Sequence, residues 1–183
     1  MYNVRMKNYG LVLISLFLGS FSIASDSETM KQKNFIVGRH VISDWIAEVK
    51  EAKKTIHVAT YKLTSKVAFD ALAAAHNRGI EVRIVLDGAE AKSRKSLAQE
   101  AIRAGMEVVF WPSNYQGELH TKFYIFDDMC VILGSFNLSE SAAGKNVEIL
   151  YKIENKEIVK GFTDEWQKLY DQSLPVNPTN IDE

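Results

Sequence analysis

The sequence has little of the residue types that mark disulfide-rich, disordered or polycationic proteins. It contains one cysteine and three prolines in 183 residues. A single cysteine excludes an internal disulfide, and the apolar stretch around Cys130 predicts a buried, inert thiol. With few prolines, 46% hydrophobic and 25% charged residues, the chain is not disordered or of low complexity. The composition and length are typical of one globular domain.

Neither sign of charge is in large excess. The formal net charge is −1, and it becomes −3 without the first 24 residues, which hold two basic residues and no acidic one. A general polycationic surface is therefore excluded, and any attraction for a polyanion has to come from a local cluster. Lys92, Arg94 and Lys95 could form such a cluster, and a solvated helix face is the alternative reading of these three residues.

The chain also lacks a long hydrophobic run. Arg5 and Lys7 precede an apolar run over Leu11–Leu18 that is too short to span a bilayer comfortably, and Ser22–Ala24 supplies the small residues that a signal peptidase reads. We therefore predict a signal peptide over residues 1–24. The alternative is an uncleaved anchor in the inner membrane. Either way, the rest of the chain is expected to be exported, as a periplasmic or secreted protein.

Beyond a polar linker over 25–34, short β-branched runs alternate with helical stretches, which is typical of a sheet covered by helices on both faces. Strands are predicted over 35–37, 55–60, 81–86, 106–110, 120–126, 129–133 and 147–153, and helices over 42–52, 66–78, 93–104 and 157–170. Asp127 and Asp128 separate two apolar runs and predict a two-residue hairpin turn. The fold class is therefore α/β, with a mixed, largely parallel sheet, one domain over 35–173 and a C-terminal tail over 174–183.

Six residues of the second half form one ordered pattern of chemically useful side chains. His120-Thr-Lys122 is followed by Asp127 and then by Gly134-Ser135-Phe-Asn137. If each identity has a chance of about one in twenty, the pattern arises by accident in roughly one of several hundred thousand chains of this length. Chance is thus a poor explanation.

This pattern resembles the HKD motif of the phospholipase D superfamily. A short chain with one copy of the motif is similar to the small bacterial Nuc-type periplasmic endonucleases. The resemblance extends over about Phe35–Tyr170 and includes Tyr61–Thr64, Gly79–Asp87, Asn146 and Glu148. It implies a phospholipase D/nuclease-like domain that cleaves phosphodiester bonds.

The alternation of side chains along a strand places His120 and Lys122 on the same face, where both could meet one phosphate. A neutral imidazole can attack phosphorus directly and an ammonium can hold the nonbridging oxygens, so no metal or other cofactor is required. The resemblance implies a phosphohistidine on His120 and a second histidine that protonates the leaving oxygen. His40, His57 and His76 lack the motif context. We therefore expect the second His120 to come from the partner in a homodimer, at a two-fold axis.

The remaining motif residues are assigned supporting roles. With a two-residue turn, the hairpin register sets Ser135 opposite His120 and puts Asn137 on the same face, so both are expected to bind the phosphate; a slip of one residue would undo this. The resemblance suggests that Glu148 orients and charges the histidine, although it could also be a solvent-facing strand residue. Asp127 and Gly134 are assigned structural roles.

Three functions remain open from the sequence. The first is a metal-independent, non-specific endonuclease for DNA or RNA. The second is a phospholipase D that hydrolyses lipid headgroups, which fits an exported protein close to a membrane. The third is a catalytically silent nucleic-acid-binding module, which an intact motif disfavours. Trp111, Pro112 and Tyr115 precede the motif and could stack on bases, enter a bilayer interface or simply cap the core.

Overall fold

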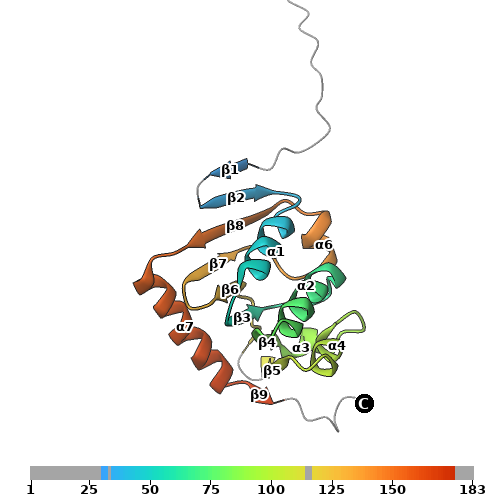
Figure 1. The fold of residues 1–183 in the computed structure, drawn as a ribbon. Helices are drawn as coiled ribbons and strands as arrows, with labels where there is room; N and C mark the ends of the chain where they lie inside the picture. Colours follow the sequence, from blue (N-terminus) through green and yellow to red (C-terminus); the bar gives the residue numbers. More distant parts are fainter. Residues whose placement is uncertain (1–29, 33, 114–116, 176–183) are drawn as a thin grey trace, which may run out of the picture.

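The computed structural model describes residues 30–32, 34–113 and 117–175 (Figure 1). This part of the chain forms one sheet whose strands are β1 (Met30–Gln32), β2 (Phe35–Gly38), β3 (Thr55–Thr60), β4 (Glu81–Asp87), β5 (Glu107–Trp111), β6 (Phe123–Phe126), β7 (Cys130–Gly134), β8 (Glu148–Ile153) and β9 (Leu174–Pro175). Its helices are α1 (Ile42–Glu51), α2 (Lys66–Asn77), α3 (Gly88–Ala91), α4 (Ala98–Arg103), α6 (Glu140–Gly144) and α7 (Lys156–Asp171). The predicted α/β class with helices on both faces is confirmed.

The strand order is β1-β2-β8-β7-β6-β3-β4-β5-β9. Among the described strands, only β3 with β4 and β4 with β5 pair in parallel, and the other six pairings are antiparallel. The mixed sheet is as predicted, but the prediction that it is largely parallel is wrong. The parallel pairs β3–β4 and β4–β5 are each joined by a helical crossover in the first half of the chain, whereas a tight turn joins β6 to β7 and the segment over 135–147, with only the short α6, leads into an antiparallel β8.

Two hydrophobic cores hold the helices on the sheet. The larger core lies under α1, α2, α4 and α6, and its largest side chain is the fully buried Trp45 of α1. The smaller core lies under α7, where Trp166 is fully buried and donates its indole N–H to the carbonyl oxygen of Val58 at 3.0 Å. Figure 1 shows α7 alone on its side of the sheet, while the other helices cover the opposite side.

Several element limits differ from the prediction. The helix predicted over 93–104 is replaced by α3 and the shorter α4, with an irregular segment over 92–97 between them. β1 lies inside the predicted linker, and β9 turns the start of the predicted tail into an edge strand paired with β5. The short helix α6 was not predicted. Residues 1–24 lie outside the described residues, so the signal peptide stays a prediction. Within the described ranges, no helix is long and apolar enough to cross a membrane.

The β6–β7 hairpin corrects the predicted register. Asp127 and Asp128 both have positive φ, as in a type I′ turn, and the amide of Met129 donates to the carbonyl of Phe126 at 3.0 Å. Met129 nevertheless stays outside the ladder, because Phe126 pairs with Cys130. The loop therefore has three residues instead of two, and the register is shifted by one from the prediction.

Candidate active site

Four segments meet at one end of the central strands. These are the segments that follow β3 and β7 and those that precede β6 and β8. β6 runs antiparallel to β3, and β7 and β8 continue that alternation, so all four segments reach the same edge of the sheet. Leu63 forms a bridge with Leu138, whose carbonyl also accepts the amides of Thr64 and Ser65 at 2.8 and 2.9 Å. The loops are thereby fixed against one another.

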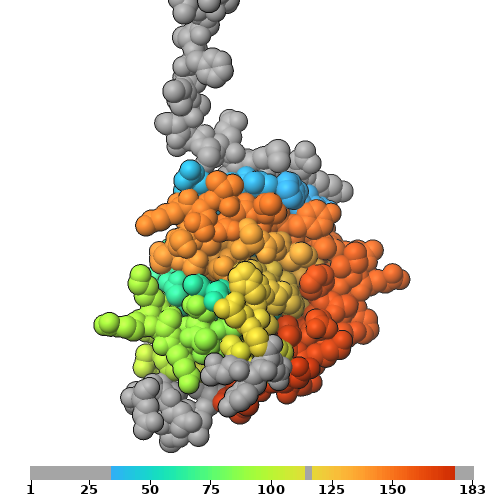
Figure 2. All heavy atoms as spheres, turned by 180° about the vertical axis from the view of Figure 1, so that it is seen from behind, coloured from blue at the N-terminus to red at the C-terminus, as the bar shows by residue number. Residues whose placement is uncertain are grey.

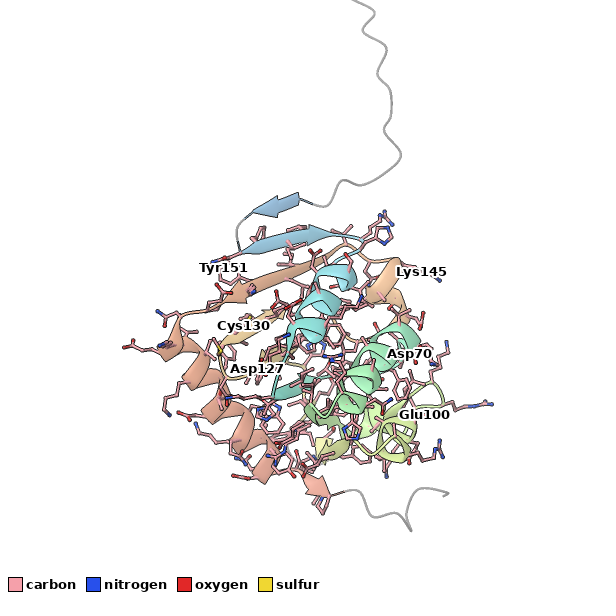
Figure 3. The ribbon with its side chains drawn as sticks, viewed as in Figure 1. Asp70, Glu100, Asp127, Cys130, Lys145 and Tyr151 are labelled. Atoms are coloured by element: carbon pink, nitrogen blue, oxygen red, sulfur yellow. The ribbon has the colours of Figure 1, made fainter. Side chains whose placement is uncertain are left out.

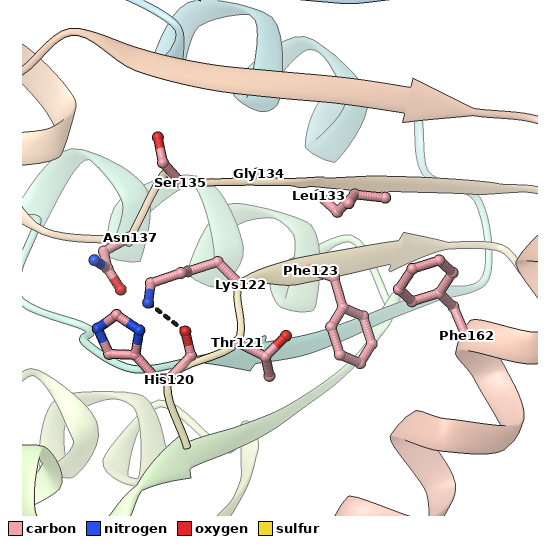
Figure 4. Close-up of a pocket in the computed structure, with 9 residues that line it drawn as sticks. All are labelled: His120, Thr121, Lys122, Phe123, Leu133, Gly134, Ser135, Asn137 and Phe162. Carbon is pink, nitrogen blue, oxygen red and sulfur yellow. Dashed lines mark hydrogen bonds between the residues drawn. The ribbon is translucent and has the colours of Figure 1, made fainter. Parts of the chain in front are cut away.

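His120 and Lys122 lie in the irregular segment before β6, not in the strand as predicted, because β6 begins at Phe123. His120 is exposed, whereas Lys122 is only 8% exposed. The Lys122 ammonium donates to the carbonyl oxygen of His120 (Figure 4). Burial lowers the pKa of Lys122; Glu148 and Glu118 act against this effect. The two side chains therefore meet at one hollow, although not by the strand alternation expected.

Tyr61 contacts both of these residues. Its ring centroid lies 4.9 Å from that of His120, and the Lys122 ammonium stands 5.4 Å from the same ring. Its hydroxyl donates to Glu118 at 3.3 Å. Burial, followed by hydrogen bonding to Glu90, raises the pKa of Tyr61 to about 12, so the phenol stays neutral at ordinary pH. Tyr61 supplies an aromatic wall that restricts the imidazole of His120.

Ser135 and Glu148 form a second pair behind the hollow. The Ser135 hydroxyl donates to the Glu148 carboxylate and accepts the amide of Ile149 at 3.1 Å, and Asn146 donates to the other carboxylate oxygen at 2.9 Å. Glu148 is only 6% exposed, so it is not the solvent-facing residue of the alternative reading. In the described structure its hydrogen bonds go to Ser135 and Asn146 instead of His120. Its charge reaches Lys122, whose pKa it raises.

Asn137 points toward His120 and Lys122, whereas the Ser135 hydroxyl points away from them (Figure 4). The side-chain oxygen of Asn137 is buried, and none of the described groups donates to it. A buried amide without a partner is costly and indicates that a further group completes the site. Rotation of the amide exchanges its oxygen and nitrogen, so Asn137 can present either an acceptor or a donor.

The hollow itself has a volume of about 390 Å³. Its polar lining comes from His120, Thr121, Lys122, Ser135 and Asn137, and its apolar lining from Phe123, Leu133 and Phe162, with Gly134 at its floor. A second hollow of about 310 Å³ adjoins it and shares His120, Thr121 and Phe123. The further lining of this second hollow is Trp111, Glu118, Leu119, Glu165 and Leu169. Trp111 thus borders the site, whereas Tyr115 lies outside the described residues.

Gly134 and Asp127, to which the sequence assigned structural roles, both contact the backbone of neighbouring segments. A Cβ on Gly134 would lie 2.0 Å from the carbonyl oxygen of Ile149, so only glycine lets β7 approach β8 at this point. The Asp127 carboxylate accepts the amides of Lys53, Lys54 and Thr55 at 2.9, 2.7 and 3.0 Å. Burial by itself raises the pKa of Asp127, but these three donors outweigh it and lower the pKa below its usual value.

Two buried residues that position the site were not assigned roles from the sequence. Asp87 accepts the amide of Leu119 at 2.9 Å and the hydroxyl of Ser113 at 2.6 Å, which fixes the segment that carries His120. Tyr124 donates to the carbonyl of Phe136 at 2.6 Å, between Ser135 and Asn137. The only sequence signal for Asp87 was its place at the end of a buried strand.

Other candidates lie away from the hollow. His57 is buried and stacks on Trp166 at 4.3 Å, as a core histidine does. Cys130 is buried, and burial raises the pKa of its thiol to about 12. Within the part of the chain that the structure describes, no group of three or more His, Cys, Asp or Glu side chains could hold a metal ion.

The fold and this set of residues define the family. Residues 45–170 match the family model of the cardiolipin synthase, phospholipase D-like domain. The chain therefore belongs to the phospholipase D-like family, and all six motif residues fall within the matched range.

Particular relatives are similar over parts of the chain. Phospholipase D of Rickettsia conorii is 31% identical over 119 residues, which are 65% of this chain and 58% of the relative. The chain thus spans little more than half the length of that relative. Among solved structures, Nuc of Salmonella typhimurium, a phospholipase D family member, superposes with a TM-score of 0.72 at 27% identity, over 78% of this chain and 97% of Nuc. NucT of Helicobacter pylori has a TM-score of 0.69 at 24% identity, over 74% and 91% of the two chains.

Proposed function

We propose that the protein is a phosphodiester hydrolase, and specifically an endonuclease of low sequence preference that works through a phosphohistidine on His120 without a metal. The observation that carries this proposal is the single hollow onto which the imidazole of His120, the buried ammonium of Lys122 and the unsatisfied amide of Asn137 all converge. This combination offers a nucleophile, a cation and a polar anchor for one phosphate.

The reaction proceeds in two displacements. In the first, a neutral ring nitrogen of His120 forms a bond to phosphorus, and the bond from phosphorus to the leaving oxygen breaks. A second, protonated histidine gives its proton to that oxygen. In the next displacement, this histidine takes a proton from water while the water oxygen attacks phosphorus and the P–N bond breaks. The histidines thus return to their initial protonation states, and the products are an alcohol and a phosphomonoester.

Lys122 and Asn137 hold the phosphate during both displacements. Lys122 loses its contact with the His120 carbonyl and donates to nonbridging oxygens, whose negative charge increases in the transition state. Asn137 rotates its amide to donate to the same group. Ser135 acts indirectly, because its hydroxyl is already bonded to Glu148 and to the amide of Ile149. It holds the Glu148 carboxylate where the negative charge favours the protonated form of Lys122. Glu148 is thus a positioning residue in this proposal.

A second copy of the chain supplies the second histidine. Five apolar side chains of β2, β7 and β8 lie on the α7 side of the sheet beyond the helix: Phe35, Val37, Leu133, Ile149 and Tyr151. The pairs Phe35–Tyr151, Val37–Ile149 and Leu133–Tyr151 are directly opposite in the ladders, so they share this outer sheet face. Ile149 and Tyr151 are 41% and 42% exposed. Figure 3 labels Tyr151 on β8. Leu133 also lines the hollow. A second copy packed on this face would therefore place its own hollow next to that of the first copy.

The single copy of the motif and the similarity to Nuc favour a nucleic acid as substrate. The chain covers 97% of the short protein Nuc, and the sequence resemblance connects this single-motif form with endonucleases. A phospholipase is the second candidate, since Phe123, Leu133 and Phe162 give the hollow an apolar wall that acyl chains could contact. We further propose that the domain acts outside the inner membrane, because of the signal-like segment over residues 1–24.

A digestion assay in EDTA tests the proposal. The purified protein is offered single-stranded DNA, duplex DNA, RNA and phospholipid vesicles. We expect cleavage of nucleic acid that EDTA does not stop and that His120→Ala reduces on the order of 10³-fold or more. His40→Ala is the matched control, because His40 is exposed and lies outside the hollow. Headgroup release without nucleic-acid cleavage would assign the protein to the lipid branch, and loss of activity in EDTA would contradict the metal-free mechanism.

A further inference from the structure

The loop between α3 and α4 carries three cations beside the active site. Lys92, Arg94 and Lys95 are all exposed, and no acidic residue occurs between Glu90 and Glu100. Among the described residues none of the three forms a salt bridge, although eight other basic residues do. In an anionic chain this is a local concentration of free positive charge.

The loop is fixed to the segment that follows β3, whose Tyr61 contacts His120. The amide of Leu97 donates to the carbonyl of Leu63 at 2.8 Å, and Lys62 forms a salt bridge with Glu90 at 3.4 Å. Lys62 in turn stands 5.2 Å from the ring of Tyr61, which contacts His120. In Figure 2 the green segment that contains the loop projects beside the yellow segment before β6, with the teal segment after β3 between them.

The charge around the hollow is uneven. On the side of α7, Glu118 and Glu165 line the second hollow and repel a polyanion. On the side of the loop, Lys62 is neutralised by Glu90, and the three free cations lie beyond this pair. Of these two sides, the loop side is therefore the one that attracts a phosphate chain held at His120, along a path over Tyr61 and Lys62.

We propose that Lys92, Arg94 and Lys95 form a backbone-binding arm for a nucleic-acid strand whose scissile phosphate lies at His120. The inference rests on the proposed endonuclease function and adds to it the path of the strand. The three side chains contact phosphates on one side of the cleaved bond without reading bases, which accords with low sequence preference. A headgroup with one phosphate cannot place phosphates at His120 and at the arm together.

The test compares a polymer with a small substrate. The triple variant Lys92→Gln, Arg94→Gln, Lys95→Gln is assayed on single-stranded DNA of about 20 nucleotides and on bis(4-nitrophenyl) phosphate. We expect the ratio of kcat/KM for DNA to that for the small diester to fall about tenfold or more. The slope of log kcat/KM for DNA against log salt concentration is expected to decrease in magnitude by about 2, from three lost phosphate contacts.

Two controls separate charge from position and from folding. Lys50→Gln, Lys54→Gln, Lys156→Gln removes the same charge at the opposite end of the sheet, before β3 and after β8, and is expected to leave the ratio unchanged. Lys92→Arg, Arg94→Lys, Lys95→Arg keeps the charge on the arm and is expected to retain the ratio.

Each outcome decides between the two proposals. If the wild type cleaves DNA and the triple variant keeps both the ratio and the salt slope, the arm is wrong while the endonuclease function stands. If the far control lowers the ratio as much as the triple variant does, the effect belongs to net charge and the arm is also wrong. If the wild type hydrolyses the small diester or lipid but no nucleic acid, the endonuclease function and the arm are both overturned.

Discussion

Asp87 shows how a single buried residue can control a reactive group that it does not touch. One of its carboxylate oxygens accepts the amides of Ala89 and Glu90, and the other accepts Ser113 and the amide of Leu119. The carboxylate therefore joins the N-terminus of α3 to the segment that carries His120, the proposed nucleophile. The position of His120 depends on this connection.

Replacing Asp87 by Asn is expected to reduce kcat on the order of 10- to 100-fold, because an amide nitrogen then faces donors and shifts the chain before His120. The loss of stability is expected to be roughly 1–3 kcal/mol. Steady-state kinetics and urea unfolding measure the two effects. Asp164→Asn, which breaks an exposed ion pair on α7, is the control and is expected to change neither. A folded Asp87→Asn protein with wild-type kcat would contradict the positioning role.

The charges around Lys122 predict two opposite shifts in the pH dependence of activity. Burial lowers the pKa of Lys122, Glu148 and Glu118 raise it, and Lys62 lowers it. In the proposed mechanism the second histidine and Lys122 must both be protonated, so the part of the alkaline limb of the pH–rate profile that belongs to Lys122 follows its pKa. Glu118→Gln removes a raising charge and is expected to move that limb to lower pH, whereas Lys62→Gln is expected to move it to higher pH. Shifts of the same sign in both variants would show that another group controls the limb.

At the scale of elements, the contact between β3 and α7 contains a titratable group. His57 of β3 is buried under Trp166, and one ring nitrogen of His57 has no partner among the described groups. Burial lowers its pKa; Asp128 opposes this effect, Arg83 adds to it, and Glu81 and Glu107 oppose it. The folded protein therefore binds this proton more weakly than the unfolded chain does.

From this difference we expect stability to decrease as the pH falls below about 6.5, the usual pKa of histidine, until the folded state also takes up the proton. His57→Phe keeps the ring against Trp166 and removes the titration. The free energy of unfolding in urea is measured at several pH values for both proteins. The part of the acid-induced loss that depends on His57 is expected to disappear in the variant. Parallel curves for the two proteins would exclude His57 as the cause.

Gly134 sets the distance between β7 and β8. Because a methyl group there meets the backbone of Ile149, Gly134→Ala is expected to destabilise the protein by about 2 kcal/mol or more and to disturb the adjacent Ser135. Gly161→Ala in α7 is the matched control. A methyl group at this helical position meets no other atom within 4 Å, so it is expected to stabilise by about 0.5–1 kcal/mol. Urea denaturation of both variants gives the comparison, and equal stability of the two would refute the steric argument.

The elements that were predicted well are those with a regular pattern of apolar residues along the sequence. β3 has the limits predicted for it, because its residues are mostly β-branched and buried, and α1, α2 and α7 agree within one residue at each end. The segment over 92–97 has a helical pattern but leaves the helix to bond Leu63, a contact made by residues far apart in sequence. β9 has only two residues and depends on pairing with Val109 and Phe110.

For the candidate site, the sequence predicted the residues that gather but not their geometry. The identities and spacing of the motif predicted which residues gather, and His120, Lys122, Ser135 and Asn137 do line one hollow. Two geometric predictions for these residues were wrong. The hairpin register is shifted by one residue because Met129 belongs to the loop, and His120 lies outside the strand. Tyr61 and Asp87 fall within the segments that carry the resemblance, but the sequence assigned them no role, because their contacts arise only when β3 and β4 end beside the motif.

At the scale of the whole molecule, the proposed dimer links an exposed apolar surface to chemistry. Ile149 and Tyr151 lie on the outer sheet face and do not line either hollow. If a second copy covers this face, Tyr151→Lys is expected to produce monomers and to reduce activity at least about 100-fold, because each site then lacks its second histidine. Sedimentation equilibrium gives the mass, and assays on the same samples give the activity. Val67→Lys, which alters an exposed apolar residue of α2, is the control.

A mixing experiment separates loss of the partner histidine from mere loss of packing. When wild-type subunits exchange with an excess of His120→Ala subunits, every mixed site lacks one imidazole, so the activity per wild-type subunit is expected to fall roughly in proportion to the remaining fraction of wild-type partners. Adding the double variant His120→Ala, Tyr151→Lys leaves the activity unchanged, because it cannot pair. Activity that is unaffected by either protein would mean that one chain completes the reaction alone. The second proton donor would then have to be another group beside the site, for example Glu118, which lines the adjoining second hollow.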